Sequence, residues 1–268
     1  LIPEFGWASV FTAGGLLTIC MGLLTLALLP ESPEFLAGRA GSWPDRATEV
    51  NKLLGRMRRA AISDIASVVP AVPTISVVAI LTPERRVRTL ALWLIYFMGF
   101  LAMYFMLSWI PTLFVDSGYT RVQGIDALTG FNLGALPGIL LLGFLTTRLP
   151  LVSLLSLFFL AAAAVLVWIG LTQPSELSTL VMLMFAGGFF LHGGFACLYA
   201  LAARLYPSDV RAAGVGWAAG LGRMGAILSP LLAAALLSAG WGMYNLFSLF
   251  ALPLIAGGLL LWVFTGDD

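Results

Sequence analysis

Long apolar stretches, separated by shorter polar connections, make up most of the chain. A helix needs about 20 mostly apolar residues to cross the hydrocarbon of a bilayer, because inside lipid every backbone polar group must be bonded within its own segment. Seven stretches reach this length, at residues 7–29, 89–115, 124–147, 150–171, 177–204, 210–237 and 241–264. The connections between the last six are short, so consecutive helices are predicted to pack as antiparallel neighbours. The pattern predicts an all-α membrane protein with about seven transmembrane helices.

The one long break between spans, residues 30–88, carries nine of the 14 basic residues. The positive-inside rule therefore places this central loop in the cytoplasm. Alternation of the spans then puts Arg148, Arg204 and Arg211 on the cytoplasmic side and Arg121 outside, which leaves Arg223 within a span. We expect a multi-pass protein of the plasma (inner) membrane whose C-terminus is also cytoplasmic.

Part of the central loop has a helical pattern of its own. In residues 46–66, apolar side chains recur near helical spacing with basic residues between them. This pattern is typical of an amphipathic helix on the inner leaflet of the membrane. A solvated linker helix without a special role fits the same residues equally well.

Composition excludes several other classes of protein. The chain is 60% hydrophobic and 10% charged, whereas an average soluble domain is about 45–50% apolar and about 25% charged. This excludes a nucleic-acid binder, a disordered chain and a secreted disulfide module. Cys20 and Cys197 lie far apart in apolar stretches without a C-x-x-C motif, so we predict no disulfide, no metal site and no cofactor.

Polar side chains inside the spans are costly in lipid and are therefore functional candidates. Arg223 carries a permanent charge and a fork of donors that fits a carboxylate, so it suits an anionic substrate or an ion pair with an acid on another helix. His192 is the only histidine; it suits a proton relay or a substrate contact, and an ordinary interhelical hydrogen bond is the other interpretation. Asn132 is an uncharged candidate for the same pocket.

Aromatic residues line one face of the second span. Tyr96, Phe100 and Tyr104 recur at helical spacing, which suits one wall of a flat pocket whose hydroxyls orient a ligand. Simple core or lipid packing explains the same spacing. Glycines also repeat every four residues, at positions 130, 134 and 138 and at 216 and 220, and are predicted to let neighbouring helices approach closely.

Several motifs resemble the major facilitator superfamily. The run LPESPEFL at residues 29–36 is similar to the P-E-S-P-R-(W/F)-L signature after the sixth helix, with Glu34 in place of the usual Arg. The run LYPSDVRAAGVGW at residues 205–217, followed by GRMGAI at 222–227, is similar to the Y-P-x-x-x-R-A-x-G-x-G-W and G-R-x-G-A pattern of the aromatic acid:proton symporter family. SWIPTL at 108–113 resembles that family's S-W-L-P-T-L.

The resemblance implies the C-terminal portion of a transporter, from the sixth helix onward. On this basis residues 1–29 are the last helix of the N-terminal bundle, 30–88 the cytoplasmic central loop, and 89–268 the C-terminal six-helix bundle. It implies Arg211 and Arg148 as gate contacts at the inner mouth. The inner loop GFLTTRLP at 143–150 lacks the Asp of the usual G-x-x-x-D-R-x-G pattern, which puts the gating role of Arg148 in doubt.

The expected function is secondary active transport and not enzymatic catalysis. The resemblance implies proton-coupled uptake of an aromatic or other organic carboxylate by alternating access, with the missing N-terminal helices and the bilayer as partners and the coupling acids in the first helix. A sugar- or drug-type facilitator of the same superfamily is the alternative. A seven-helix receptor is remote, since the only lysine, Lys52, lies in a loop, and an intramembrane hydrolase lacks a G-x-S-x-G partner for His192.

Overall fold

The computed structural model describes residues 6–29, 36, 43–57, 59–61, 80–207 and 210–264. It contains seven helices long and apolar enough to cross a membrane, which confirms the predicted number of spans. They are α2 (Ala8–Leu28), α6 (Arg86–Asp116), α7 (Arg121–Leu145), α8 (Leu151–Thr172), α9 (Leu177–Leu205), α10 (Arg211–Ser238) and α11 (Met243–Leu260), the last extended by the 3-10 helix η2 (Leu261–Phe264). Residues 30–35 of the P-E-S-P run and the C-terminal residues 265–268 lie outside the described part.

The chain divides into two units, Leu1–Val72 and Pro73–Asp268. The first unit contains α2 and the shorter helix α4 (Trp43–Arg56). α2 is apolar on all sides, and none of its side chains is buried. A helix of this kind is stable only when lipid or another helix covers its surface.

α4 is amphipathic, as the sequence predicted. Val50 and Leu53 are buried on one side of the helix, while Lys52 is exposed. The predicted extent to residue 66 was wrong, because α4 ends at Arg56 and residues 59–61 are not helical. Gly55, two residues before the last described residue of this segment at position 57, weakens the helix near its end.

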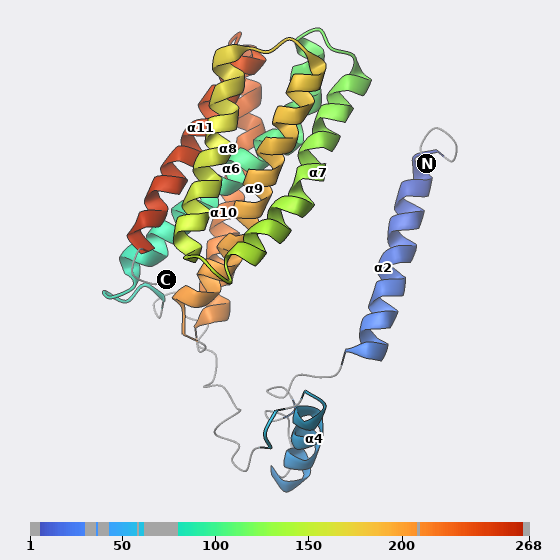
Figure 1. The fold of residues 1–268 in the computed structure, drawn as a ribbon, viewed down its shortest axis with the longest axis vertical. Coiled ribbons are helices and arrows are strands. Elements are labelled where there is room, and N and C mark those ends of the chain that lie inside the picture. Colours follow the sequence, from blue (N-terminus) through green and yellow to red (C-terminus); the bar gives the residue numbers. More distant parts are fainter. Residues whose placement is uncertain are drawn as a thin grey trace. The chain divides into compact units, whose positions relative to one another are not determined.

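The second unit is a bundle of six helices, α6 to α11, that run alternately up and down (Figure 1). The helices with the most extensive contacts are α7 with α9, α6 with α10, and α8 with α11. The prediction that consecutive helices pack as neighbours was right for α6 with α7 and for α8 with α9, and it was wrong for α7 with α8 and for α10 with α11, which make almost no contact. Short loops make consecutive helices antiparallel, but the size of the facing side chains decides which helices meet.

Glycines close the contact between α7 and α9. A Cβ atom on Gly134 would lie 2.6 Å from the backbone nitrogen of Phe189 and closer still to the carbonyl of Phe185. Gly138 lies in the same way against the Phe189 carbonyl, and Gly188 of α9 lies against the carbonyl of Phe131. We call this contact the α7–α9 seam, and it confirms the predicted packing role of the first glycine repeat.

The other two pairs are built on the same principle. Gly225 of α10 lies against the carbonyl of Phe97 on α6, and the Ser229 hydroxyl donates a 2.7 Å hydrogen bond to the carbonyl of Leu101. Between α8 and α11, the Ser156 hydroxyl donates a 2.8 Å hydrogen bond to the carbonyl of Gly258. Small residues and hydroxyls therefore replace large side chains wherever two backbones meet.

The second glycine repeat behaves differently. No atom of the described residues lies within 4 Å of a Cβ built on Gly216 or Gly220. These glycines face away from the bundle, on the side of α10 opposite to Gly222 and Gly225. The prediction that neighbours approach this face is therefore not met within the described part of the chain.

Candidate functional site

Three predicted polar residues lie near the middle of three different helices. Asn132 of α7, His192 of α9 and Arg223 of α10 each lie within about 3 Å of the midpoint of their helix at about 1.5 Å of rise per residue. Midpoints of membrane-spanning helices lie in hydrocarbon, where a polar side chain needs a partner. Each of these three side chains is therefore expected to contact a polar partner or a ligand.

Arg223 lies on the exposed face of α10. Neither an ion pair nor a hydrogen bond joins its side chain to any residue that the structure describes. Gly216 and Gly220 flank it on the same face and leave open space beside it. Its neighbour in sequence, Gly222, projects about 100° further around the helix and packs against Tyr96 and Phe100 of α6. Arg223 thus combines a fixed backbone position with an unpaired charge.

His192 packs against Phe131, the residue that precedes Asn132 in α7. The His192 ring lies 4.8 Å from the Phe131 ring, and its Nδ1 atom lies 3.0 Å from the carbonyl oxygen of Gly188. Because a carbonyl oxygen only accepts, Nδ1 is the donor and Nε2 of the neutral ring is the free acceptor. The exposed Asn132 amide donates to the Leu128 carbonyl one turn earlier, at 2.9 Å. Among the described residues, no group of three potential metal ligands occurs.

The predicted aromatic stripe of α6 is continuous in the structure. Tyr96 and Phe100 have ring centroids 6.4 Å apart, and Phe100 and Tyr104 have centroids 5.9 Å apart. Two residues of α9 that the sequence analysis did not select, Phe195 and Tyr199, extend the stripe into a cluster. Their spacing of four residues is the same signal that had selected the α6 aromatics.

Burial divides the cluster into an inner and an outer part. Tyr96 is fully buried and Phe100 is 5% exposed, whereas Tyr104 and Tyr199 are 40% and 39% exposed. Within the described part of the chain, the buried Tyr96 hydroxyl has no hydrogen-bond partner, and neither does the buried indole nitrogen of Trp93 one turn away. Buried tyrosine and tryptophan donors usually find a partner. An unpaired donor in a fully buried position is therefore a feature that needs an explanation.

The two predicted gate residues have local partners. Arg211 donates a 3.2 Å hydrogen bond from Nε to the carbonyl of Tyr206, at the end of α9. Arg148 lies in the turn after α7, and its guanidinium lies 5.6 Å from the centre of the Phe144 ring at the end of that helix. Arg148 and Arg204 line one hollow of about 360 Å³ at this end of the bundle. The lining of this hollow is thus cationic, without an acidic residue among its members.

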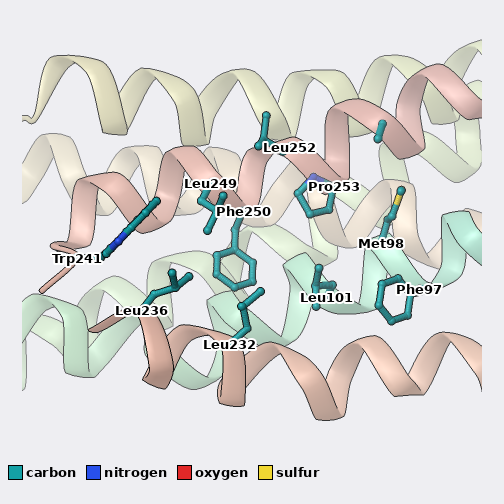
Figure 2. A pocket seen from close by; sticks show the side chains of 11 residues that line it. Phe97, Met98, Leu101, Leu232, Leu236, Trp241, Leu249, Phe250, Leu252 and Pro253 are labelled. Carbon is teal, nitrogen blue, oxygen red and sulfur yellow. The ribbon is translucent and has the colours of Figure 1, made fainter. Parts of the chain in front are cut away.

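A separate groove of about 530 Å³ runs between α6, α10 and α11. Figure 2 shows Trp241 at one end of the groove, Phe250 in its middle, and Phe97 and Met98 at the other end. None of the predicted site residues lines it, and its walls are almost wholly apolar. Binding of a carboxylate needs a charged or donating group, so this groove is not the candidate site for an anion.

Comparison with known proteins agrees with the sequence resemblance. Residues 92–268 match the family model described as Major Facilitator Superfamily. The chain is 37% identical to a gallate transporter of Pseudomonas putida, over 97% of this chain and 57% of the relative. It is 34% identical to a 4-hydroxybenzoate transporter of Pseudomonas aeruginosa, over 94% of this chain and 56% of the relative.

A third relative is the 3-(3-hydroxy-phenyl)propionate transporter of Escherichia coli K12, 30% identical over 97% of this chain and 56% of the relative. The chain therefore spans a little more than half the length of the curated relatives that it matches. The family match covers five of the six helices of the second unit in full and most of α6. The chain is a multi-pass membrane protein that belongs to the Major Facilitator Superfamily.

Proposed function

We propose that the protein is a secondary transporter that takes up an aromatic carboxylate together with protons by alternating access. The observation that carries this proposal is Arg223, an unpaired and permanent positive charge at the middle of a membrane-spanning helix. An arginine binds a carboxylate through two parallel hydrogen bonds. The relatives that transport gallate, 4-hydroxybenzoate and 3-(3-hydroxy-phenyl)propionate support an aromatic acid as the ligand.

In this proposal the substrate contacts α6, α7, α9 and α10. Arg223 binds the carboxylate, Asn132 and His192 contribute polar contacts at a similar depth, and Tyr96, Phe100 and Tyr104 form the aromatic wall. Substrate sites of such transporters lie near the midplane of the bilayer, between two bundles that rock against each other. We assign residues 89–268 to the C-terminal bundle and residues 1–29 to the last helix of the N-terminal bundle.

His192 suits a role in proton movement because its Nε2 is free to accept a proton while Nδ1 donates to Gly188. Arg211 and Arg148 would act at the inner mouth, on the side that also carries the basic central loop. The proposed location is the plasma membrane, with the central loop in the cytoplasm, and the basic residues of that loop support this orientation. Proton coupling needs at least one group that gains and loses a proton during the cycle, and an arginine cannot be that group.

The test is uptake by the complete protein, as its gene encodes it, in sealed vesicles with an acidic exterior. We expect accumulation of radiolabelled 4-hydroxybenzoate or gallate that a protonophore abolishes. Arg223→Lys keeps the charge but loses the bidentate fork, and should reduce uptake about tenfold or more, since a charge-assisted hydrogen bond contributes about 1.5–3 kcal/mol. Arg121→Lys is the matched control: Arg121 is the first residue of α7, outside the proposed site, and this variant should transport normally.

Uptake no greater than in empty vesicles, or uptake of a sugar instead of the acids, would reject the proposed substrate class. Accumulation that persists without a pH gradient would reject proton coupling but would leave the proposed binding of the carboxylate by Arg223 intact. Normal affinity in Arg223→Lys would remove this residue from the site.

A further inference from the structure

The buried hydroxyl of Tyr96 is the least satisfied polar group in the aromatic cluster. Tyr96 is fully buried and its hydroxyl has no partner among the described residues. A buried hydroxyl without a hydrogen bond is unfavourable, and more so in a protein surrounded by lipid, where water cannot replace the missing partner. The native fold therefore tolerates a group whose hydrogen bond has to come from elsewhere.

The neighbours of Tyr96 show from which side that partner can come. Tyr96 packs edge to face against Phe195, with ring centroids 6.2 Å apart, and against Tyr199, with centroids 5.4 Å apart and planes at 86°. α10 closes a further side, because a Cβ on Gly222 would lie 2.8 Å from the Cβ of Tyr96. Phe100 covers the direction along α6.

Tyr199 is the one exposed residue among these neighbours. It is 39% exposed, whereas Phe100 is 5% exposed and Phe195 is wedged between the helices, 3.0 Å from a Cβ built on Gly99. An exposed tyrosine side chain changes rotamer on a fast timescale, while the wedged rings cannot move without separating helices. A ligand therefore reaches the Tyr96 hydroxyl when the ring of Tyr199 turns aside.

We propose that Tyr96 is the specificity-determining residue that pairs with the ring hydroxyl of a hydroxylated aromatic acid, and that Tyr199 covers it when no ligand is bound. This inference rests on the proposed transport of aromatic carboxylates and adds the feature that the site selects. The tyrosine hydroxyl can donate to the ring hydroxyl or accept from it. Arg223 is next to Gly222, which packs on Tyr96, so the carboxylate and hydroxyl contacts lie along the same pair of helices.

Hydrogen bonding to Tyr96 should favour a hydroxylated aromatic acid over the same acid without the ring hydroxyl. A site that forms a hydrogen bond with a substrate hydroxyl discriminates strongly against the analogue without it, because a buried group is left unpaired. An acid with an unsubstituted ring leaves the Tyr96 hydroxyl as unsatisfied as it is in the empty protein. A ring hydroxyl removes that penalty when it binds.

The experiment compares two acids in vesicles that contain the complete protein: labelled 4-hydroxybenzoate and labelled benzoate. The readout is the ratio of their apparent affinities, which a loss of folded protein does not change because it lowers both uptakes equally. Tyr96→Phe removes only the hydroxyl, and should reduce the preference for 4-hydroxybenzoate about tenfold, the equivalent of one hydrogen bond. Tyr244→Phe, which loses a hydroxyl bonded to the Pro174 carbonyl, is the matched control and should keep the wild-type ratio.

A second comparison separates the residue that recognises the hydroxyl from the residue that covers it. Tyr199→Phe retains the ring and should keep the ratio, whereas Tyr199→Ala should change the affinity for both acids together. Equal ratios in wild type and Tyr96→Phe, with both acids transported, would overturn this inference alone. A reduced ratio in Tyr199→Phe with a normal ratio in Tyr96→Phe would transfer the role to Tyr199. Transport of neither acid would instead overturn the proposed function.

Discussion

The α7–α9 seam predicts that a single methyl group at Gly134 separates two helices. A Cβ at this position would lie 2.6 Å from the Phe189 nitrogen, whereas ordinary contacts begin at 3.4 Å. The opposing atoms belong to the backbone of α9 and cannot change rotamer. Gly134→Ala therefore forces the two helices apart by nearly 1 Å.

The expected change in the free energy of unfolding is the difference between a steric cost and a gain in helix propensity. Extra volume in a tightly packed contact destabilises by about 1–3 kcal/mol, and a gap of about 0.5–1 Å removes a quarter to a half of the dispersion energy of the atoms that face it. Alanine in place of glycine favours the helix by about 0.5–1 kcal/mol. We expect Gly134→Ala to lower the free energy of unfolding by about 1–2 kcal/mol.

The matched control is Gly143→Ala in the same helix, where no atom lies within 4 Å of the added Cβ. Only the preference of alanine over glycine in a helix acts there, so the free energy of unfolding of this variant should be higher by about 0.5–1 kcal/mol. The assay is denaturant unfolding of the purified protein in mixed micelles, followed by helical circular dichroism. Equal shifts for the two variants would contradict the steric argument.

A double variant gives a stricter test of the same seam. Once Gly134→Ala has separated the helices, the methyl of Gly138→Ala enters space that is already open, so the second loss should be smaller than the first. Strictly additive losses would show that the two glycines act independently and that the helices do not move apart as rigid bodies.

Three further predictions concern hydrogen bonds at the ends of the helices. Ser156→Ala removes the bond from α8 to the Gly258 carbonyl and should reduce the free energy of unfolding by about 1–3 kcal/mol, whereas the exposed Ser153→Ala should change it by less than about 0.5 kcal/mol in the same denaturant titration. Thr89→Val removes a buried hydroxyl that donates to the Ile80 carbonyl and accepts from the Tyr206 hydroxyl. It should reduce the free energy of unfolding by about 1–3 kcal/mol. An unchanged midpoint of unfolding in Ser156→Ala or Thr89→Val would contradict the corresponding prediction. Hydrogen bonds from its own backbone N–H and from Thr82 lower the pKa of the Glu84 carboxyl below its usual value of 4.5, so its contribution to stability is present above that value and is lost as the pH falls through the lowered pKa. The protection factors for hydrogen exchange of the backbone amides at the start of α6 should therefore fall in acid in the wild type and depend less on pH in Glu84→Gln.

The sequence was sufficient for the number and limits of the spans, because length and apolar content alone decide whether a helix can cross a bilayer. It was not sufficient for the order of packing. A membrane helix is apolar on all sides, so its periodicity does not indicate which face is buried. The first glycine repeat marked the buried face of α7, but the repeat at Gly216 and Gly220 is equally regular and faces open space. Spacing alone could not separate the two.

The candidate site was predictable in its charges and less so in its aromatic part. Arg223, His192 and Asn132 stand out in any apolar span because polar residues are rare there. Phe195 and Tyr199 do not stand out, since aromatic residues are frequent throughout the chain. Their importance follows from contacts between α6 and α9 that only the three-dimensional structure brings together. The absence of a partner for the Tyr96 hydroxyl is likewise a property of the fold.

The two sides of α10 connect the packing of the bundle to its proposed chemistry. Gly222 and Gly225 hold one side against α6, and Arg223, one residue along the chain, projects from the exposed face about 100° further around the helix. Because Gly222 packs on the Cβ of Tyr96 and the ring of Phe100, and Gly225 packs on the backbone of Phe97, the close approach of two helices sets the backbone position of the arginine. A substitution such as Gly222→Ala should therefore displace the Arg223 charge relative to the α6 aromatics without altering either group. Tight glycine packing in this bundle thus fixes the geometry that a carboxylate bound at one end and a ring hydroxyl bound at the other would have to match.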